Sequence, residues 1–173
     1  MTSTPPRAAD EITLPAPRTV LSLDHVSRSF GEGEQRVDAI IDVSLGINPG
    51  TFAAVMGPSG SGKSTLLGLA GGLDQPTSGT VSVCGEPLGG MSRDDLARVR
   101  RRQLGFVFQD YNLVPTLTAV ENVSLPLELD GASAKRARNA AEIALERVGL
   151  PDLADRHIEE MSGGQRQRVA IAR

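Results

Sequence analysis

The chain has 173 residues and a formal net charge of −3, and 39% of its residues are hydrophobic and 23% charged, which is typical of one globular domain. No apolar run approaches the roughly 20 residues that a membrane-spanning helix needs, and the near balance of charges does not favour binding to nucleic acid or to an anionic membrane. The lone cysteine, Cys84, excludes an internal disulfide and a cysteine-based zinc cluster, and it fits a reducing compartment.

The first half of the chain predicts a tail followed by strands. Residues 1–19 are rich in Pro, Ser and Thr and lack the apolar core of a secretory signal, so we expect a mobile tail there. Residues 20–26 and 37–47 alternate apolar with polar, which predicts half-buried strands of an antiparallel sheet. Residues 52–56 form a continuous apolar run, which predicts a strand covered on both faces, and residues 80–84 predict a further strand.

The second half is predicted to be mainly helical. A Ser or Thr followed three residues later by an acid or Gln marks a helix start. Such pairs are Ser92 with Asp95, Thr118 with Glu121, and Ser162 with Gln165. Alanines and other apolar residues at helical spacing predict another helix that ends at Gly149. Between the first two of these starts, residues 104–108 are expected to return to a strand.

A glycine-rich segment carries the first chemical motif. Residues 57–64 match the pattern G-x-x-x-x-G-K-[ST] at every fixed position, between a predicted strand and a predicted helix. Glycines let the backbone point successive N–H groups at phosphates, while Lys63 reaches the outer phosphates and Ser64 a magnesium ion. The predicted nucleotide-binding residues are Gly57, Ser59, Gly60, Ser61, Gly62, Lys63, Ser64 and Thr65. Such a loop by itself does not distinguish among kinases, GTPases and motor ATPases.

A second motif narrows the choice among these classes of nucleotide-binding protein. Residues 161–173 resemble the signature sequence of the ATP-binding cassette (ABC) family, with Met161 in place of the usual leading Leu. Two glycines and a Ser cap at a helix N-terminus form another exposed anion site. The resemblance implies that this site closes on the nucleotide of a second cassette, so we expect a head-to-tail homodimer. The residues predicted for this contact are Ser162, Gly163, Gly164 and Gln165.

The resemblance implies roles for two further residues. Gln109 follows a predicted strand at the place of the family's Q-loop glutamine, which implies a catalytic and magnesium contact that also senses a transport subunit. Phe30 stands where the family usually carries an adenine-stacking Tyr. Stacking on an aromatic face tolerates loss of the hydroxyl. Lys63 and Gln109 are the expected catalytic residues, Ser64 and Gln109 the metal ligands, and ATP and Mg²⁺ the cofactors.

The resemblance covers residues 20–173 and implies an α/β fold. We expect a P-loop NTPase (RecA-like) core with an antiparallel β subdomain and a helical subdomain at about residues 112–165, its C-terminal strands absent from this chain. Residues 71–79 and 104–127 are most similar to the lipoprotein-releasing and macrolide-exporting branch. This implies an ATP-binding subunit on the cytoplasmic face of the membrane that couples ATP hydrolysis to an integral-membrane permease and binds no nucleic acid.

Two alternatives stay open at this point. One is an ABC-type ATPase of a non-transport, division-associated membrane complex. The other is a cassette that binds ATP without hydrolysing it, because the family's Asp-Glu strand and switch histidine lie beyond the signature helix and do not occur here. The missing Glu would orient or deprotonate the attacking water.

Overall fold

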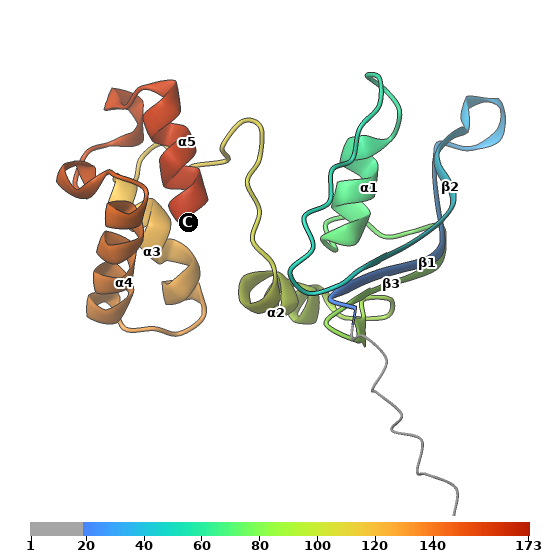
Figure 1. The fold of residues 1–173 in the computed structure, drawn as a ribbon, viewed down its shortest axis with the longest axis horizontal. Helices are drawn as coiled ribbons and strands as arrows, with labels where there is room; N and C mark the ends of the chain where they lie inside the picture. The colour runs from blue at the N-terminus through green and yellow to red at the C-terminus, as the bar shows by residue number, and fades with distance from the viewer. Residues whose placement is uncertain (1–18) are drawn as a thin grey trace, which may run out of the picture. The chain divides into compact units, whose positions relative to one another are not determined.

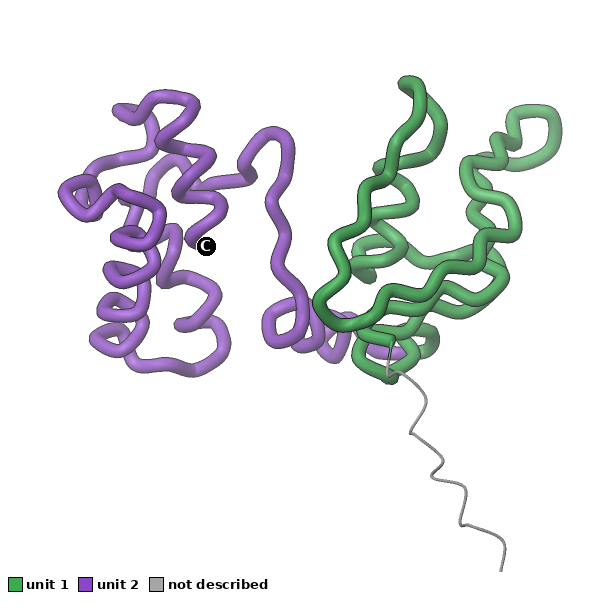
Figure 2. Tube along the Cα trace, in the orientation of Figure 1, with its two compact units in different colours: residues 1–90 green, residues 91–173 purple. Residues whose placement is uncertain are grey.

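The computed structural model describes residues 19–173, so the predicted tail, apart from Thr19, lies outside the described residues. The chain divides into two compact units, residues 1–90 and residues 91–173, shown in green and purple in Figure 2. The described part of unit 1 holds a sheet and the α-helix α1, and unit 2 is helical (Figure 1). Among the described residues, no helix is both long and apolar enough to cross a bilayer.

The sheet of unit 1 has the strand order β2-β1-β3-β4 and is antiparallel throughout. Its strands are β1 (Leu21–Phe30), β2 (Val37–Ile47), β3 (Ser78–Val83) and β4 (Glu86–Pro87), and the short 3-10 helix η1 (Gly33–Gln35) joins the first two. Leu21 pairs with Ile47 on one side and with Val83 on the other. Leu23, Val26 and Val81 are almost fully buried, which confirms the predicted antiparallel β subdomain.

Helix α1 (Lys63–Ala70) follows the glycine-rich segment and contacts β1, β2 and β3. Its Leu69 is fully buried, whereas Leu67 stays 59% exposed. The helix ends at Gly71, whose N–H donates to the carbonyl groups of Leu67 and Leu69. The burial of Leu69 is therefore the apolar contribution that fixes this helix within unit 1.

Two predicted strands are wrong as secondary structure. Residues 52–56 and 104–108 belong to no helix or strand. Phe52 is 94% exposed and Met56 85%. A strand exists only where its N–H and C=O groups pair with a neighbour, and the described residues supply no neighbour for either segment. Within residues 104–108, Phe106 and Phe108 stack with ring centroids 5.6 Å apart, as residues two apart on an extended chain can.

Unit 2 consists of helices whose starts the sequence predicted. The helices are α2 (Arg93–Gln103), α3 (Ala119–Leu129), α4 (Ala134–Arg147) and α5 (Gly163–Ala172), with the 3-10 helices η2 (Pro151–Leu153) and η3 (Ile158–Glu160) between α4 and α5. The hydroxyls of Ser92, Thr118 and Ser162 each accept from the backbone N–H three residues on. Gly149, with φ +72°, follows α4 as a left-handed terminator.

The core of unit 2 lies among α3, α4 and α5. Ala119, Val120, Leu145 and Val169 are each no more than 1% exposed in one apolar cluster. Asn122, also fully buried, donates to the carbonyl groups of residues 114, 117 and 118 and accepts from the N–H of Val114. This side chain therefore joins α3 to the backbone of the loop before it, and its own polar atoms are satisfied although it is buried.

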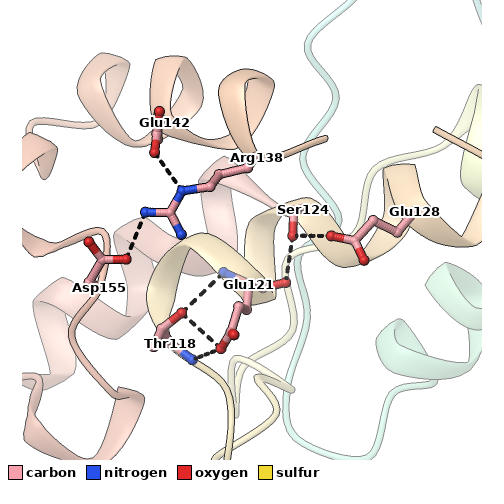
Figure 3. Close-up of polar contacts among 7 residues, drawn as sticks. All are labelled: Thr118, Glu121, Ser124, Glu128, Arg138, Glu142 and Asp155. Carbon is pink, nitrogen blue, oxygen red and sulfur yellow. Dashed lines mark hydrogen bonds and ion pairs between the residues drawn. The ribbon is translucent and has the colours of Figure 1, made fainter. Parts of the chain in front are cut away.

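Polar contacts stabilise the start of α3 and join α4 to the segment after η2 (Figure 3). Arg138 on α4 donates to Glu142 on the same helix and to Asp155 beyond it, at 2.9 and 2.8 Å. Glu121 reaches back to the N–H and hydroxyl of Thr118. Donation from the Thr118 N–H is the main cause that lowers the pKa of Glu121, because that hydrogen bond favours the charged carboxylate.

Candidate functional site

The glycine-rich loop at residues 57–62 has backbone angles that its sequence requires. Gly57, Gly60 and Gly62 have φ values of +153°, +78° and +86°, a region that other residues rarely adopt. A Cβ on Gly62 would lie 2.5 Å from the carbonyl oxygen of Ala39 in β2, and one on Gly57 would lie 2.7 Å from the Ser61 hydroxyl. The loop therefore wraps tightly and is seated directly on the sheet.

Lys63 is folded across this loop. Its Nζ donates to the carbonyl oxygens of Gly57 at 2.9 Å and Pro58 at 2.6 Å and lies 3.4 Å from the hydroxyl of Ser61. These contacts hold the ammonium group at the loop, and residues 19–173 supply no carboxylate partner for it. A positive charge with no acidic counterion beside it is suited to a bound phosphate.

The N-terminus of α1 adds a second attraction for anions. No side chain caps it, and its first turn contains no acid. The N–H groups of Lys63, Ser64 and Thr65 open the helix, and such groups together with the helix dipole favour a phosphate group. The hydroxyl of Ser64, which is exposed, belongs to the same turn.

The loop and this helix start fit ATP and Mg²⁺ as cofactors. The loop is wrapped so tightly that a Cβ at Gly57 would meet the Ser61 hydroxyl and one at Gly62 would meet β2, and Lys63 supplies the charge. Ser64 would offer one oxygen to magnesium, the type of ligand that this ion prefers, while bound phosphates complete its sphere. Among the described residues, no group of three or more His, Cys, Asp or Glu could hold a metal by itself. Gln109, the second predicted metal ligand, belongs to the other unit, so its contact with the same ion stays a prediction.

Phe30 ends β1 and is 43% exposed. The guanidinium carbon of Arg28 lies 4.5 Å from the centre of its ring. The exposure leaves the ring available for a planar base, as its predicted role requires. The contact with Arg28 was not predicted, although a basic residue two positions away on the same strand was the available signal.

Gln109 lies in a turn at the end of the extended residues 104–108 and is exposed. The loop that follows has two consecutive left-handed residues, Tyr111 with φ +61° and Asn112 with φ +51°. Such backbone is strained for residues other than glycine and persists only where neighbours fix it. One such neighbour is the C-terminal end of α5.

Arg173, just after α5, donates to the carbonyl oxygen of Asn112 at 2.8 Å. Burial lowers the pKa of this guanidinium, which marks it as partly withdrawn from water. At the other end of the helix, the Tyr111 hydroxyl lies 3.6 Å from where a Cβ on Gly163 would be. The loop after Gln109 therefore lies along the signature helix, a contact that sequence reasoning did not find.

The signature residues form the N-terminus of α5. Ser162 Oγ accepts from the N–H of Gln165, and Gln165 Oε1 accepts from the N–H of Ser162. Gly164 is exposed with open space around it. The hydroxyl hydrogen of Ser162 and the glycine N–H groups are thus placed where an anion could bind, while Gln165 is engaged in the cap.

The predicted residues fall into two groups by unit. Unit 1 brings the glycine-rich loop at residues 57–62, called the phosphate loop below, together with β1 and β2. Gly62 contacts the segment of β2 where Ile40 pairs with Arg28. Unit 2 brings the loop after Gln109 together with Gly163. In Figure 1 the phosphate loop and the turn from β1 to β2 both project from the upper end of unit 1.

Comparison with known proteins identifies the family. The ABC transporter profile matches residues 40–173. The chain is 46% identical over 158 residues to the macrolide export ATP-binding/permease protein MacB of Marinobacter nauticus, and it is 45% identical over 154 residues to the uncharacterized ABC transporter ATP-binding protein YknY of Bacillus subtilis. These matches cover 91% and 89% of this chain, but 24% of MacB and 67% of YknY.

A solved structure gives the same assignment. The dimeric ATP-binding cassette MJ0796, in a post-hydrolysis state bound to ADP and phosphate, superposes with a TM-score of 0.82 at 42% identity. The match covers 88% of this chain and 67% of that cassette. The α/β P-loop fold expected from the sequence is thereby confirmed, and the chain spans part of a cassette. The chain belongs to the ABC transporter ATPase family, in the branch that includes MacB.

Proposed function

We propose that this chain is the ATP-binding part of an export-type ABC transporter and that it binds MgATP at the loop of residues 57–65. The observation that carries this proposal is Lys63, whose ammonium group lies on the loop carbonyls beside an uncapped helix N-terminus. Lys63 would bind the outer phosphates, Ser64 the magnesium ion, and Phe30 the base. Magnesium when bound would neutralise charge on the phosphates.

We further propose that Ser162, Gly163 and Gly164 bind the nucleotide of a second cassette in a head-to-tail dimer. Support comes from the exposed N-terminus of α5 and from the dimeric state named for MJ0796. Residues 20–173 would then be an incomplete nucleotide-binding domain, with a helical subdomain at about residues 112–165. The name of MacB, a macrolide export ATP-binding/permease protein, supports a permease as partner. We propose that this partner is an integral-membrane permease and that the chain lies at the cytoplasmic face of the membrane.

ATP hydrolysis is the reaction that the family implies. We propose that Lys63 and Gln109 bind and orient the nucleotide for it.

The test is MgATP binding by Lys63→Met with Lys135→Met as its matched control. Lys135 is the other lysine of the chain and is exposed at the start of α4. Loss of a charged hydrogen-bonding group at the phosphates should weaken binding about 10-fold to 100-fold in Lys63→Met, and Lys135→Met should bind as the unaltered chain does. Equal affinity in both variants, measured by calorimetry, would contradict the proposed site.

A further inference from the structure

Arg28 covers one side of the aromatic ring that is proposed to bind the base. Its guanidinium carbon lies 4.5 Å from the centre of the Phe30 ring, within the range of a cation–π contact. Arginine stacks on aromatic rings because its guanidinium group is planar. With one side of the ring taken by Arg28 and the ring still 43% exposed, a planar base has a remaining side on which to stack.

The position of Arg28 is fixed by Asp74. Arg28 Nε lies 3.0 Å from Asp74 Oδ2, and the terminal nitrogen NH2 lies 2.9 Å from Oδ1. The two side chains are 25% and 32% exposed, so water screens them less than it screens a fully exposed pair. Two parallel bonds between a guanidinium group and a carboxylate also fix orientation, which a single contact does not.

Asp74 is itself attached to the phosphate-binding helix. The N–H groups of Leu73 and Asp74 donate to the carbonyl oxygen of Gly68 in α1. The segment that follows runs along β1, because Thr77 N–H donates to the carbonyl oxygen of Ser27 and Ser29 N–H donates to the Thr77 hydroxyl. A continuous set of contacts therefore joins α1, whose first turn faces the phosphates, to the strand that ends in Phe30.

We propose that Arg28 and Asp74 are positioning residues for the nucleotide. Arg28 holds the ring of Phe30 at the angle at which a base stacks, and Asp74 ties that ring to α1, so that base and triphosphate are bound in one fixed geometry. The inference rests on the proposed ATP site and adds to it two residues that do not touch the phosphates. Since any base has a π face, the pair should strengthen binding of ATP and GTP alike over a triphosphate without a base.

The experiment compares MgATP with magnesium tripolyphosphate, which has no base, by calorimetry on the 173-residue chain. Arg28→Met keeps the aliphatic stem but removes the charged fork, and it should weaken MgATP binding about 3-fold while tripolyphosphate binds unchanged. Asp74→Asn should act in the same direction. The double variant should be no weaker than the stronger single variant, because the two residues act through one contact.

Two further variants make the comparison specific. Phe30→Ala should weaken MgATP at least as much as Arg28→Met does, again without effect on tripolyphosphate. Arg36→Met is the matched control, since Arg36 lies between β1 and β2 and bonds Asp38 and Ser29, and it should bind both ligands normally. If Arg28→Met fails to fold by circular dichroism, Arg28→Lys and Asp74→Asn replace it, because each loses the paired geometry at nearly constant volume.

Each other outcome overturns the inference in a distinguishable way. Equal weakening of both ligands by Arg28→Met would show that Arg28 acts only through the fold. A selective effect of Phe30→Ala without one of Arg28→Met would mean that the ring stacks unaided, and the proposed ATP site would stand. If Phe30→Ala changes the affinities for MgATP and for tripolyphosphate by the same factor, no base stacks on the Phe30 ring. Failure of the unaltered chain to bind MgATP would overturn both the inference and the proposed function.

Discussion

Large apolar side chains are buried in the helical cluster of unit 2 but exposed in the apolar segment 52–56 of unit 1. Leu145 in the cluster is fully buried, whereas Phe52 is 94% exposed. The cluster is built from α3, α4 and α5, each of which satisfies its own backbone hydrogen bonds and has only to bury one face. Residues 52–56 belong to no helix or strand, and a strand satisfies its backbone hydrogen bonds only beside another strand. A helix thus finds its backbone hydrogen-bond partners within its own segment, while a core strand needs partners from a distant segment of the chain.

The largest expected effect is in the cluster. Leu145→Ala would leave a cavity among α3, α4 and α5 and should lower the free energy of unfolding by about 2–5 kcal/mol. Ile143→Ala on the same helix is the control, since Ile143 is 52% exposed and should cost less than about 0.5 kcal/mol. Urea unfolding followed by circular dichroism measures both. Equal costs would contradict the burial of α4.

A substitution at exposed Phe52 should have almost no effect on stability, in contrast with one at buried Leu145. Phe52→Ser removes an exposed apolar ring from an unpaired segment, so the free energy of unfolding should change by less than about 0.5 kcal/mol. Solubility should rise, because exposed apolar side chains promote association between molecules. Thermal unfolding and light scattering of the two proteins at equal concentration test this. A loss of several kcal/mol would show that residues 52–56 are buried in solution.

The smallest expected effect is a pH dependence in the sheet. His25 Nδ1 lies 2.7 Å from Asp42 Oδ1, and this hydrogen bond, then the charges of Asp42 and Asp24, raise the pKa of His25. A histidine whose pKa is raised by folding stabilises the fold below its unfolded pKa, and that contribution disappears as the pH rises through the folded pKa. The difference in melting temperature between the unaltered chain and His25→Gln should therefore shrink from about pH 6 to pH 8.

A difference that stays constant over this range would mean that the protonated pair contributes nothing. Because both side chains are mostly exposed, salt should also reduce the effect. Titration of the His25 ring by NMR gives its folded pKa independently and identifies the pH at which the difference should vanish.

The sequence by itself determined the features that depend on near neighbours. The hydroxyls of Thr118 and Ser162 cap helices through residues three positions on, and the phosphate loop closes within residues 57–63. Such contacts can be read from spacing because the intervening chain is too short to place them elsewhere. The antiparallel strands also followed from alternation, since one face of each must meet a core.

Only the tertiary structure decided which distant groups meet. Arg28 and Asp74 are 46 positions apart and Arg173 and Asn112 are 61 apart, and no spacing rule connects them. For the same reason the apolar runs at residues 52–56 and 104–108 were predicted as strands but are unpaired. Hydrophobicity shows that a segment favours burial, while the hydrogen-bonding neighbour that makes it a strand is supplied by another part of the fold.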